Sequence, residues 1–436
     1  MLIKRIQVSN FKSSKSLDIE LGQFNVLIGA NAAGKSNFIR IFRFLRDIID
    51  FGLENAVSLQ GGAEYMRNLN LTGKDDALEY KVSFTPDKPF KFFKTCDSVQ
   101  YGFLITELIF EFQLGFSEDS SEYYIKSDKL CQKFDAYNLR VLKSGKYKRG
   151  KLITSSNFTI SKSRNKFSFE FDKTEDLPFN ADELRHTFFL GDQSFVEKKK
   201  LLHSKLMGNV LMLQTPMFFM PHVENIKSDI SGIAVYDFDP KLPKQVTKIA
   251  AKADLEENGE NLSIVLKKIL ANEDKRRTLF NLINDILPFV DNLDVEKMFD
   301  KTLLLKLREV YSDKHYLPAS LISDGTISII ALIVALYFEK NPVAFFEEAE
   351  RRIHPHLISK VIDMMKDASA HKQIIVSTHN PEVVKYAGLD LESLMLVSRD
   401  KEGYSTMDRP HKKKDLSVFL KNEIGIEELF VQNLLG

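Results

Sequence analysis

The sequence of 436 residues lacks tryptophan altogether and contains only two cysteines, Cys96 and Cys131. Two cysteines are too few for a disulfide scaffold, and these two have no partner spacing for zinc or redox chemistry. We therefore expect a reducing, cytoplasmic environment. The lack of tryptophan excludes little, because 34 phenylalanines can supply aromatic volume to a core.

A strong excess of one charge sign is also missing, since 61 basic side chains face 60 acidic ones and the formal net charge is +1. This balance excludes a uniformly basic protein that coats nucleic acid, and it leaves room only for a local basic stripe. Contents of 44% hydrophobic and 28% charged residues are typical of a globular protein rather than of a disordered or fibrous one.

Long hydrophobic runs are absent as well. The chain turns polar at Ser9 and Asn10, so we expect no secretory signal. The most apolar run, residues 327–338, contains Ser328 and is shorter than the roughly 20 residues that a membrane-spanning helix needs. We therefore expect no association with a membrane.

The periodicity of apolar residues predicts an α/β protein with an additional antiparallel sheet. Residues 3–21 alternate as in a hairpin, and residues 24–28 have the pattern of a buried strand that leads into helical spacing. Aromatic and β-branched residues alternate with polar ones over 80–116 and 158–171, which predicts the antiparallel sheet. From 182 to about 287 the spacing becomes helical and several prolines interrupt it, as in an inserted subdomain.

The last third of the chain returns to alternating helices and strands. A helix is expected over 326–339, and strands are expected over 343–346 and 374–377. We accordingly expect three parts: an N-terminal lobe of the core with the β-subdomain (1–181), a mainly helical insertion (182–300) and a C-terminal lobe of the core (301–436).

The segment from Gly29 to Ser36 reads GANAAGKS and fits the phosphate-loop pattern G-x-x-x-x-G-K-[ST] in full. It follows a predicted strand and opens a predicted helix, so backbone amides and the helix N-terminus could face a phosphate. Lys35 would neutralise β- and γ-phosphate charge, and Ser36 would offer an oxygen to Mg²⁺. A chance glycine turn is the alternative, but the complete pattern in this context favours nucleotide binding.

Three weaker motifs follow in the last third. Ser323-Asp324-Gly325 precedes an apolar helix, and it could either face a phosphate or simply cap the helix. Glu347 and Glu348 end an apolar strand, which suits a metal-facing acid followed by a water-polarising acid, or else a solvated strand end. His379 ends another strand, and in isolation it would more often be a capping or core histidine.

Taken in order, these motifs resemble those of the RecF/SMC-like branch of ABC-type ATPases, bacterial proteins often labelled AAA-family ATPases and related to the OLD-type enzymes. Residues 6–13 resemble the first strand of that branch, and residues 258–262 resemble the segment ahead of its helical lobe. His354-Pro355-His356 resembles the turn after its Walker B strand. The resemblance spans nearly the full chain and implies an ABC-type P-loop head with an antiparallel β-subdomain and a mainly helical insertion.

The resemblance also implies ATP and Mg²⁺ as ligands and a role for each motif. Glu348 would activate the attacking water, and His379 would sense the γ-phosphate. Ser323 and Gly325 would contact the γ-phosphate held by the opposite subunit, so a homodimer or higher homo-oligomer would close around two nucleotides. The other residues assigned to the nucleotide are Gly29, Asn31, Gly34, Lys35, Ser36 and Asn37, and those assigned to the metal are Ser36, Glu347 and Gln60.

Two positions depart from the family pattern. Glu347 stands where an aspartate is usual, and its side chain is longer by one carbon bond of ~1.5 Å. Because Mg²⁺ demands near-ideal octahedral geometry, this change could slow turnover. Ala349 stands where proline is usual. Gln60 lies where a metal-linked glutamine is expected, although a plain loop glutamine is the simpler interpretation.

Three functions remain open at this stage. The first is an ATPase subunit of a bacterial anti-phage defence complex, as in the Septu, PARIS and retron systems, whose dimer closure controls a separately encoded nuclease or toxin. The second is a RecF-like DNA clamp that uses the basic runs 143–149 and 198–200, which could equally be solvated faces. The third is an ATP-gated scaffold with little hydrolysis. We expect no appended nuclease domain, because no metal-nuclease constellation is visible.

Overall fold

A computed structural model describes residues 1–68, 76–86, 90–117, 122–141, 147–163, 166–172, 174–188, 209–217, 220–250, 252–312, 314–380, 383 and 392–409. The chain divides into two compact units. The first unit comprises Met1–Leu21, Arg40–Gly232 and Asp400–Thr406, and the second comprises Gly22–Ile39, Ile233–Arg399 and Met407–Gly436. Most of the two basic runs, residues 143–146 and 198–200, falls outside the described residues.

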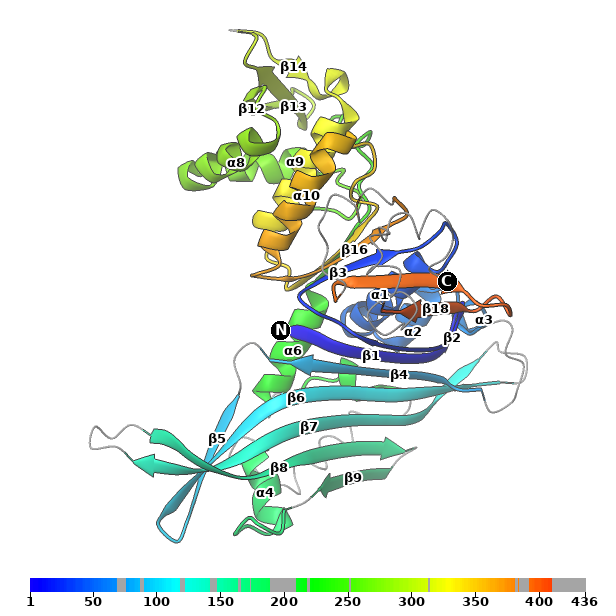
Figure 1. Cartoon of the computed structure of the whole chain (residues 1–436), viewed down its shortest axis with the longest axis vertical. Helices are drawn as coiled ribbons and strands as arrows, with labels where there is room; N and C mark the ends of the chain where they lie inside the picture. Colours follow the sequence, from blue (N-terminus) through cyan, green and yellow to red (C-terminus); the bar gives the residue numbers. More distant parts are fainter. Residues whose placement is uncertain are drawn as a thin grey trace, which may run out of the picture. The chain divides into compact units, whose positions relative to one another are not determined.

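The first unit is built on an antiparallel sheet with the strand order β2-β1-β4-β6-β7-β8-β9, and β5 pairs with β6 (Figure 1). The expected antiparallel subdomain is therefore confirmed. Its strands are β1 (Leu2–Phe11), β2 (Ser14–Glu20), β4 (Leu78–Thr85), β5 (Lys91–Cys96), β6 (Val99–Phe116), β7 (Tyr123–Val141), β8 (Tyr147–Ser163) and β9 (Lys166–Phe171). Its helices are α2 (Leu53–Leu59), α3 (Ala63–Met66), α4 (Ala181–Phe188), η1 (Met212–Gln214) and α6 (Pro221–Ser231).

Phenylalanine and tyrosine fill the core on one face of this sheet. The rings of Tyr80 and Phe112 stack with their centroids 5.0 Å apart, and Phe44 of α1 (Lys35–Phe51) packs against both. The hydroxyl of Tyr80 donates a hydrogen bond to the Ile41 carbonyl at 3.2 Å, so burying this polar atom leaves it satisfied. The many phenylalanines thus supply the aromatic core volume that tryptophan would otherwise provide.

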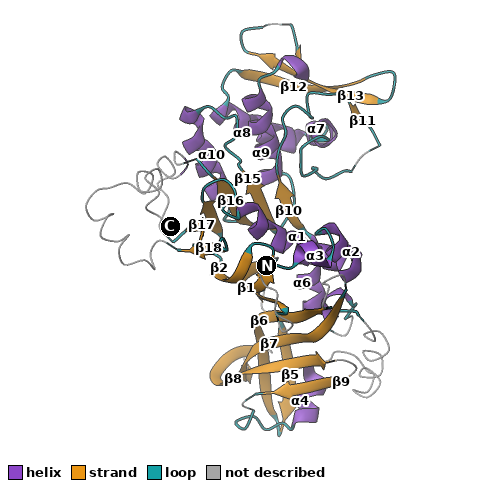
Figure 2. Cartoon of the chain, turned by 90° about the vertical axis from the view of Figure 1, so that its right-hand side faces the viewer, coloured by secondary structure: helices purple, strands orange, loops and turns teal. Residues whose placement is uncertain are grey.

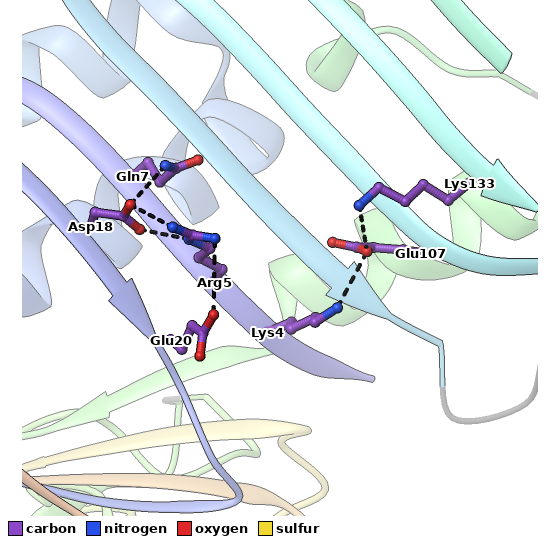
Figure 3. A network of polar contacts seen from close by, with 7 residues as sticks. All are labelled: Lys4, Arg5, Gln7, Asp18, Glu20, Glu107 and Lys133. Atoms are coloured by element: carbon purple, nitrogen blue, oxygen red, sulfur yellow. Dashed lines mark hydrogen bonds and ion pairs between the residues drawn. The ribbon is translucent and has the colours of Figure 1, made fainter. Parts of the chain in front are cut away.

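The other face carries charged side chains that pair between strands of the sheet (Figure 3). Glu107 lies between Lys4 and Lys133, at 3.4 and 3.0 Å, and Arg5 makes two hydrogen bonds of 2.6 Å to Asp18. Burial raises the pKa of Glu107, but the hydrogen bond and charge of Lys133 outweigh it, so the pKa is lowered overall. Pairing between opposite charges on adjacent strands stabilises the register of the sheet.

The second unit contains a mainly parallel sheet with the order β10-β15-β16-β3-β17-β18. Its strands are β3 (Phe24–Ile28), β10 (Ile233–Tyr236), β15 (Val343–Glu347), β16 (Gln373–Thr378) and β17 (Leu394–Arg399), and the residues of β18 (Ser405–Asp408) are divided between the ranges of the two units. The strands expected over 24–28, 343–346 and 374–377 are confirmed, as is the α/β class of the chain. Pairing is parallel from β10 through β17.

Helices α7 (Leu262–Leu270), α8 (Glu273–Ile286), α9 (Asp324–Tyr337) and α10 (Pro355–Ala368) share one hydrophobic core with this sheet. Helix α9 contains the most apolar run of the sequence, and every residue from Thr326 to Leu336 is buried. A helix that is apolar on all sides must be surrounded by protein, which explains its central place. Among the described residues, the helices are too short or too polar to span a membrane.

The range 182–300 contains strands as well as helices. Ile233–Tyr236 forms β10, which pairs in parallel with β15 and so belongs to the core sheet. Val290–Lys297 forms β12, which pairs with β13 (Thr302–Glu309) in a small sheet that also holds β11 (Thr247–Lys248) and β14 (Leu317–Pro318). Figure 2 shows β12 and β13 beside α7, α8 and α9. Strand β10 has only four residues, too few for periodicity to distinguish it from a helical turn.

Candidate functional site

The phosphate loop connects β3 to α1, as the sequence predicts. Ala32 and Gly34 have φ of 63° and 119°, so the loop uses left-handed backbone twice. A Cβ on Gly29 would lie 2.3 Å from the carbonyl oxygen of Val397 in β17, so only glycine fits there. Glycine is therefore needed at the two positions for different reasons: Gly29 permits the close approach of a neighbouring strand, and Gly34 permits the turn into the helix.

Lys35 points back into the loop. Its Nζ donates hydrogen bonds to the carbonyls of Gly29 and Ala30, at 2.7 and 3.0 Å, and the side chain is only 7% exposed. Burial lowers the pKa of Lys35, while the charges of three nearby glutamates, Glu348, Glu350 and Glu347, oppose that shift. The ammonium group is thus held at the loop by weak neutral acceptors, which phosphate oxygens could replace with stronger charge-assisted bonds.

The parallel strands gather further polar residues at one edge of their sheet. Glu347 ends β15 and Asp237 follows β10, and the two strands pair with Tyr236 opposite Phe346. Because carboxyl ends of parallel strands meet at the same edge, these residues and the phosphate loop share a cavity of about 380 Å³. The cavity is lined by Asn31, Ala32, Gly34, Lys35, Ser36, Asn37, Asp237, Glu347, Glu348, Arg351, Ser377 and Arg399.

Ser36 and Glu347 bring two oxygen ligands together. The Ser36 hydroxyl donates to the Glu347 Oε2 at 2.9 Å. Hydroxyl and carboxylate oxygens are the ligands that Mg²⁺ prefers, and in phosphate-loop sites the substrate and waters complete its coordination. Among the described residues no group of three or more His, Cys, Asp or Glu side chains converges as a self-sufficient metal cage. The donor set therefore fits a magnesium ion that is shared with a polyphosphate.

Glu348 is held in a sterically unusual conformation. Its φ is 47°, in the left-handed region, and its backbone N–H donates to the Ser377 carbonyl at 2.9 Å. Its Oε1 lies 2.8 Å from the His379 Nδ1, and since an ionised carboxylate can only accept, the imidazole is the donor in that state. Such strain costs of order 1–3 kcal/mol and persists only where the surroundings impose it. Here the paired strands β15 and β16 impose it.

A buried carboxyl group lies behind this pair. Glu350 Oε1 and the Thr378 Oγ1 form a short hydrogen bond, and Thr378 Oγ1 also accepts from the Asn380 N–H at 2.9 Å. Burial raises the pKa of Glu350, with the Thr378 hydrogen bond opposing, and its Oε2 has no hydrogen-bond partner within the described residues. The hydrogen bonds of Thr378 to Glu350 and to Asn380 fix the segment before His379.

The Ser323-Asp324-Gly325 motif begins helix α9. Ser323 is its N-cap, and its hydroxyl accepts from the Thr326 N–H at 3.1 Å, so the capping role weighed from the sequence is present. Within the described part of the chain, neither Ser323 nor Gly325 lines the cavity around the phosphate loop. The contact of this motif with a nucleotide held by another copy stays a prediction.

Gln60 belongs to the first unit, where it is buried at the end of α2. Its backbone carbonyl accepts a hydrogen bond of 3.0 Å from the Lys12 ammonium. This contact concerns the main chain, and the role of the Gln60 side chain as a metal ligand stays a prediction.

Three charged residues of the cavity belong to none of the motifs that the sequence pointed to: Asp237, Arg351 and Arg399. The Arg399 Nε donates to the Ala32 carbonyl at 2.8 Å and so braces the phosphate loop. Arg351 follows Glu348 by three residues and presents an exposed guanidinium to the cavity. Asp237 directly follows β10 and Arg399 ends β17, so each stands at the end of a parallel strand.

Several solved structures are similar to the chain over most of its length. Among solved structures it is similar to an SMC head bound to the C-winged helix domain of ScpA, with 14% identity, a TM-score of 0.48, and coverage of 94% of this chain and 98% of that chain. The SMC head domain from Thermotoga maritima gives 12% identity, a TM-score of 0.42, and coverage of 94% and 99%. An Smc head domain with a coiled coil and joint from Pyrococcus yayanosii gives 11% identity, a TM-score of 0.43, and coverage of 97% of this chain and 99% of that chain.

A comparison with curated proteins finds no match. Residues 24–156 and 216–385, more than half of the chain, match the model of a protein family. The chain therefore belongs to the family described as "AAA domain, putative AbiEii toxin, Type IV TA system".

Proposed function

We propose that the chain is an ABC-type ATPase, in which the loop from Gly29 to Ser36 binds ATP with Mg²⁺ and two copies close on two nucleotides. One observation carries this proposal above the others. Lys35, Ser36, Glu347 and Glu348 come from two segments about 310 residues apart, yet they line one cavity at the carboxyl edge of a parallel sheet. The family's description as an AAA domain supports the same class of activity.

The residues of the loop would act first, by binding. Lys35 would exchange its bonds to the Gly29 and Ala30 carbonyls for β- and γ-phosphate oxygens, and the amides at the start of α1 would face the same group. Ser36 and Glu347 would hold the metal. When bound, Mg²⁺ supplies positive charge that neutralises the phosphate oxygens and stabilises the charge that develops during transfer.

Glu348 and His379 would act on the attacking water. Glu348 is fixed by its strained backbone and by its contact with His379, so its carboxylate can accept a proton from a water that lies in line with the γ-phosphate. A positioned general base contributes roughly 10²- to 10⁴-fold to such a reaction. His379 would respond to the γ-phosphate and change its contact with Glu348, which links the state of the nucleotide to the base.

The second copy would complete each site. Ser323 and Gly325 do not line the cavity of their own chain among the described residues, and this supports a contact made across a dimer. Closure driven by ATP would then control a separately encoded effector, a nuclease or toxin, in a cytoplasmic anti-phage defence complex. The family's description as a toxin of a toxin–antitoxin system supports a partnered role of this kind. Nucleic acid as a trigger belongs to the same proposal.

The test compares two site variants with a surface control. Lys35→Ala should lose ATP binding, whereas Glu348→Gln should keep it and accumulate an ATP-bound dimer that light scattering detects. Lys360→Ala serves as the control, because Lys360 is an exposed lysine of the same unit whose contact is with the Asp285 carbonyl. Wild-type ATP affinity in Lys35→Ala, or wild-type phosphate release in Glu348→Gln, would refute the proposal. ATP binding without phosphate release by the wild-type protein would favour the scaffold alternative.

A further inference from the structure

The first residues of α9 are held by cations from two other segments of the second unit. Asp324 forms a short ion pair with Lys244, and its other carboxylate oxygen lies 3.7 Å from the Arg352 Nη1. The same Arg352 nitrogen pairs with Asp239 at 3.2 Å. The Lys244 hydrogen bond lowers the pKa of Asp324 despite the opposing effect of burial, so the carboxylate is ionised near neutral pH.

Gly325 adds a steric contact to this ion cluster. A Cβ on Gly325 would lie 2.8 Å from the carbonyl oxygen of Arg352, closer than real side chains come. The helix start therefore packs directly on the backbone of Arg352, and glycine is required there for close approach rather than for its dihedral angles. Asp324 and Gly325 thus both contact Arg352, the first through an ion pair and the second through close packing on its backbone.

Arg352 lies at the end of a stiff turn that begins at Glu348. Both residues have left-handed backbone, with φ of 47° and 67°. Within the turn, the Arg351 N–H donates to the Glu348 carbonyl at 2.9 Å, and the Ile353 N–H donates to the Glu350 carbonyl at 3.0 Å. Because both ends of the turn are conformationally restricted and its backbone is hydrogen-bonded, a displacement of Arg352 is expected to displace the rest of the turn as well. The acid proposed to activate water is therefore tied to the start of α9 in the same chain.

Lys244 is anchored on the other side of the cluster. It ends a segment that starts at the cavity residue Asp237 and contains Pro240 and Pro243. Backbone bonds fix this segment, from Asp239 N–H to the Asn258 carbonyl at 3.1 Å and from Leu242 N–H to the Asp239 carbonyl at 3.0 Å. The cluster thus joins three pieces of the second unit: the segment after β10, the turn after β15 and the start of α9.

Burial distinguishes this cluster from an ordinary surface ion pair. The side chains of Lys244, Asp324 and Arg352 are 18%, 34% and 30% exposed. By contrast, Asp274 and Arg277 on α8 form a pair at 4.0 Å with side chains 93% and 80% exposed. Exposed pairs of that kind contribute little, whereas partly buried networks resist rearrangement.

We infer that Asp324 is a positioning residue for the reaction, clamped by Lys244 and Arg352 so that the Ser323-Gly325 turn of one copy is set in register with its own Glu348 turn. This inference rests on the proposed function, in which that turn caps the nucleotide of the opposite copy. The clamp links the two sites of a dimer, because each chain's base and the turn it offers to its partner are fixed to one another.

The first experiment measures Asp324→Asn and Lys244→Met, with Asp274→Asn as the matched control. ATP hydrolysis should fall on the order of 10- to 100-fold in both clamp variants, because displacement of a positioning group by about 1 Å has an effect of that size. ATP affinity and Tm should stay close to wild type, since Lys35 and the phosphate loop are untouched. The double variant should lose little more than either single variant, because the two residues act as one unit.

The second experiment asks where Asp324 acts. In an equimolar mixture of Lys35→Ala and Asp324→Asn chains, half of the dimers contain one site that has an intact phosphate loop and an intact turn from the partner. About a quarter of the wild-type rate should therefore return if loss of Asp324 displaces the turn and leaves Glu348 of the same chain in place. In a Glu348→Gln background, Asp324→Asn should also weaken the ATP-dependent dimer, which light scattering measures.

The outcomes separate this inference from the proposed function. Wild-type hydrolysis by Asp324→Asn, or an inactive mixture, would overturn the positioning role across the dimer while leaving the ATPase intact. A wild-type protein that neither hydrolyses ATP nor dimerises with it would overturn the proposed function, and this inference with it.

Discussion

Substituting Gly29 by alanine tests the geometry of the phosphate loop most directly. The new Cβ would lie 2.3 Å from the Val397 carbonyl oxygen and 3.1 Å from the Val397 Cβ. Ordinary contacts between such atoms are longer by roughly 1 Å, and neither neighbour is the end of a flexible side chain. The loop or strand β17 must therefore move.

The size of the effect follows from what moves with the loop. Gly29 offers its carbonyl to Lys35, and β17 carries Arg399, which holds the Ala32 carbonyl. A shift of about 1 Å in groups that position a substrate can lower activity on the order of 10²-fold. Overpacking of the core should also lower the free energy of unfolding by about 1–3 kcal/mol. We expect a weakened but folded protein with severely reduced ATP affinity.

The assay is ATP titration by calorimetry together with thermal unfolding, and Gly22→Ala is the matched control. Gly22 lies just before β3 in the same unit, and a Cβ there would meet its nearest atom at 3.7 Å, an ordinary contact. Gly22→Ala should therefore bind ATP as the wild type does. If Gly29→Ala bound ATP with unchanged affinity, the close approach of Val397 would not constrain the loop, and our account of the motif's first glycine would be wrong.

Three further changes probe other parts of the chain. Burial raises the pKa of Asp128 to about 7 against the opposing Met212 N–H and Lys162, so stability is lost as pH rises through that value. Between about pH 5.5 and pH 8, the free energy of unfolding in urea should fall by about 2 kcal/mol more for the wild type than for Asp128→Asn. The same dependence of that free energy on pH in both proteins would contradict this. Glu347→Asp should raise the rate of phosphate release at limiting Mg²⁺ above that of the wild type, and a lower rate would show that the site is adapted to glutamate. Ile330→Ala, at a fully buried position of α9, should lower the free energy of unfolding by about 2–5 kcal/mol, and a change below about 1 kcal/mol would contradict the central place of α9 in the core.

The phosphate loop was predictable because its chemistry is local. Eight consecutive residues carry the turn, the lysine and the hydroxyl, and the flanking strand and helix have clear periodicity. Glu347 and Glu348 were recognisable for a related reason, since they directly end a buried strand. Their closeness to the loop was an expectation from the order of motifs, and the Ser36–Glu347 hydrogen bond of 2.9 Å now gives it a distance.

Asp237 could not be predicted in the same way. Its strand, β10, has only four residues and lies in a range that otherwise has helical spacing and prolines. Its sheet partner β15 begins about 110 residues further along the chain, so no local pattern connects them. A short buried strand is specified by the strand beside it rather than by its own sequence, which is why tertiary pairing decided its type.

The Asp324 cluster shows a second limit of reading motifs one at a time. From the sequence, Asp324 was the residue between Ser323 and Gly325, and Arg352 belonged to no motif. The structure gives both a common purpose, because Gly325 lies against the Arg352 carbonyl and Asp324 lies between two cations. Asp324 and Arg352 are 28 residues apart in the sequence, and only the fold brings them together. Under the proposed function, the helix that offers Ser323 to a partner is braced on the turn that holds Glu348.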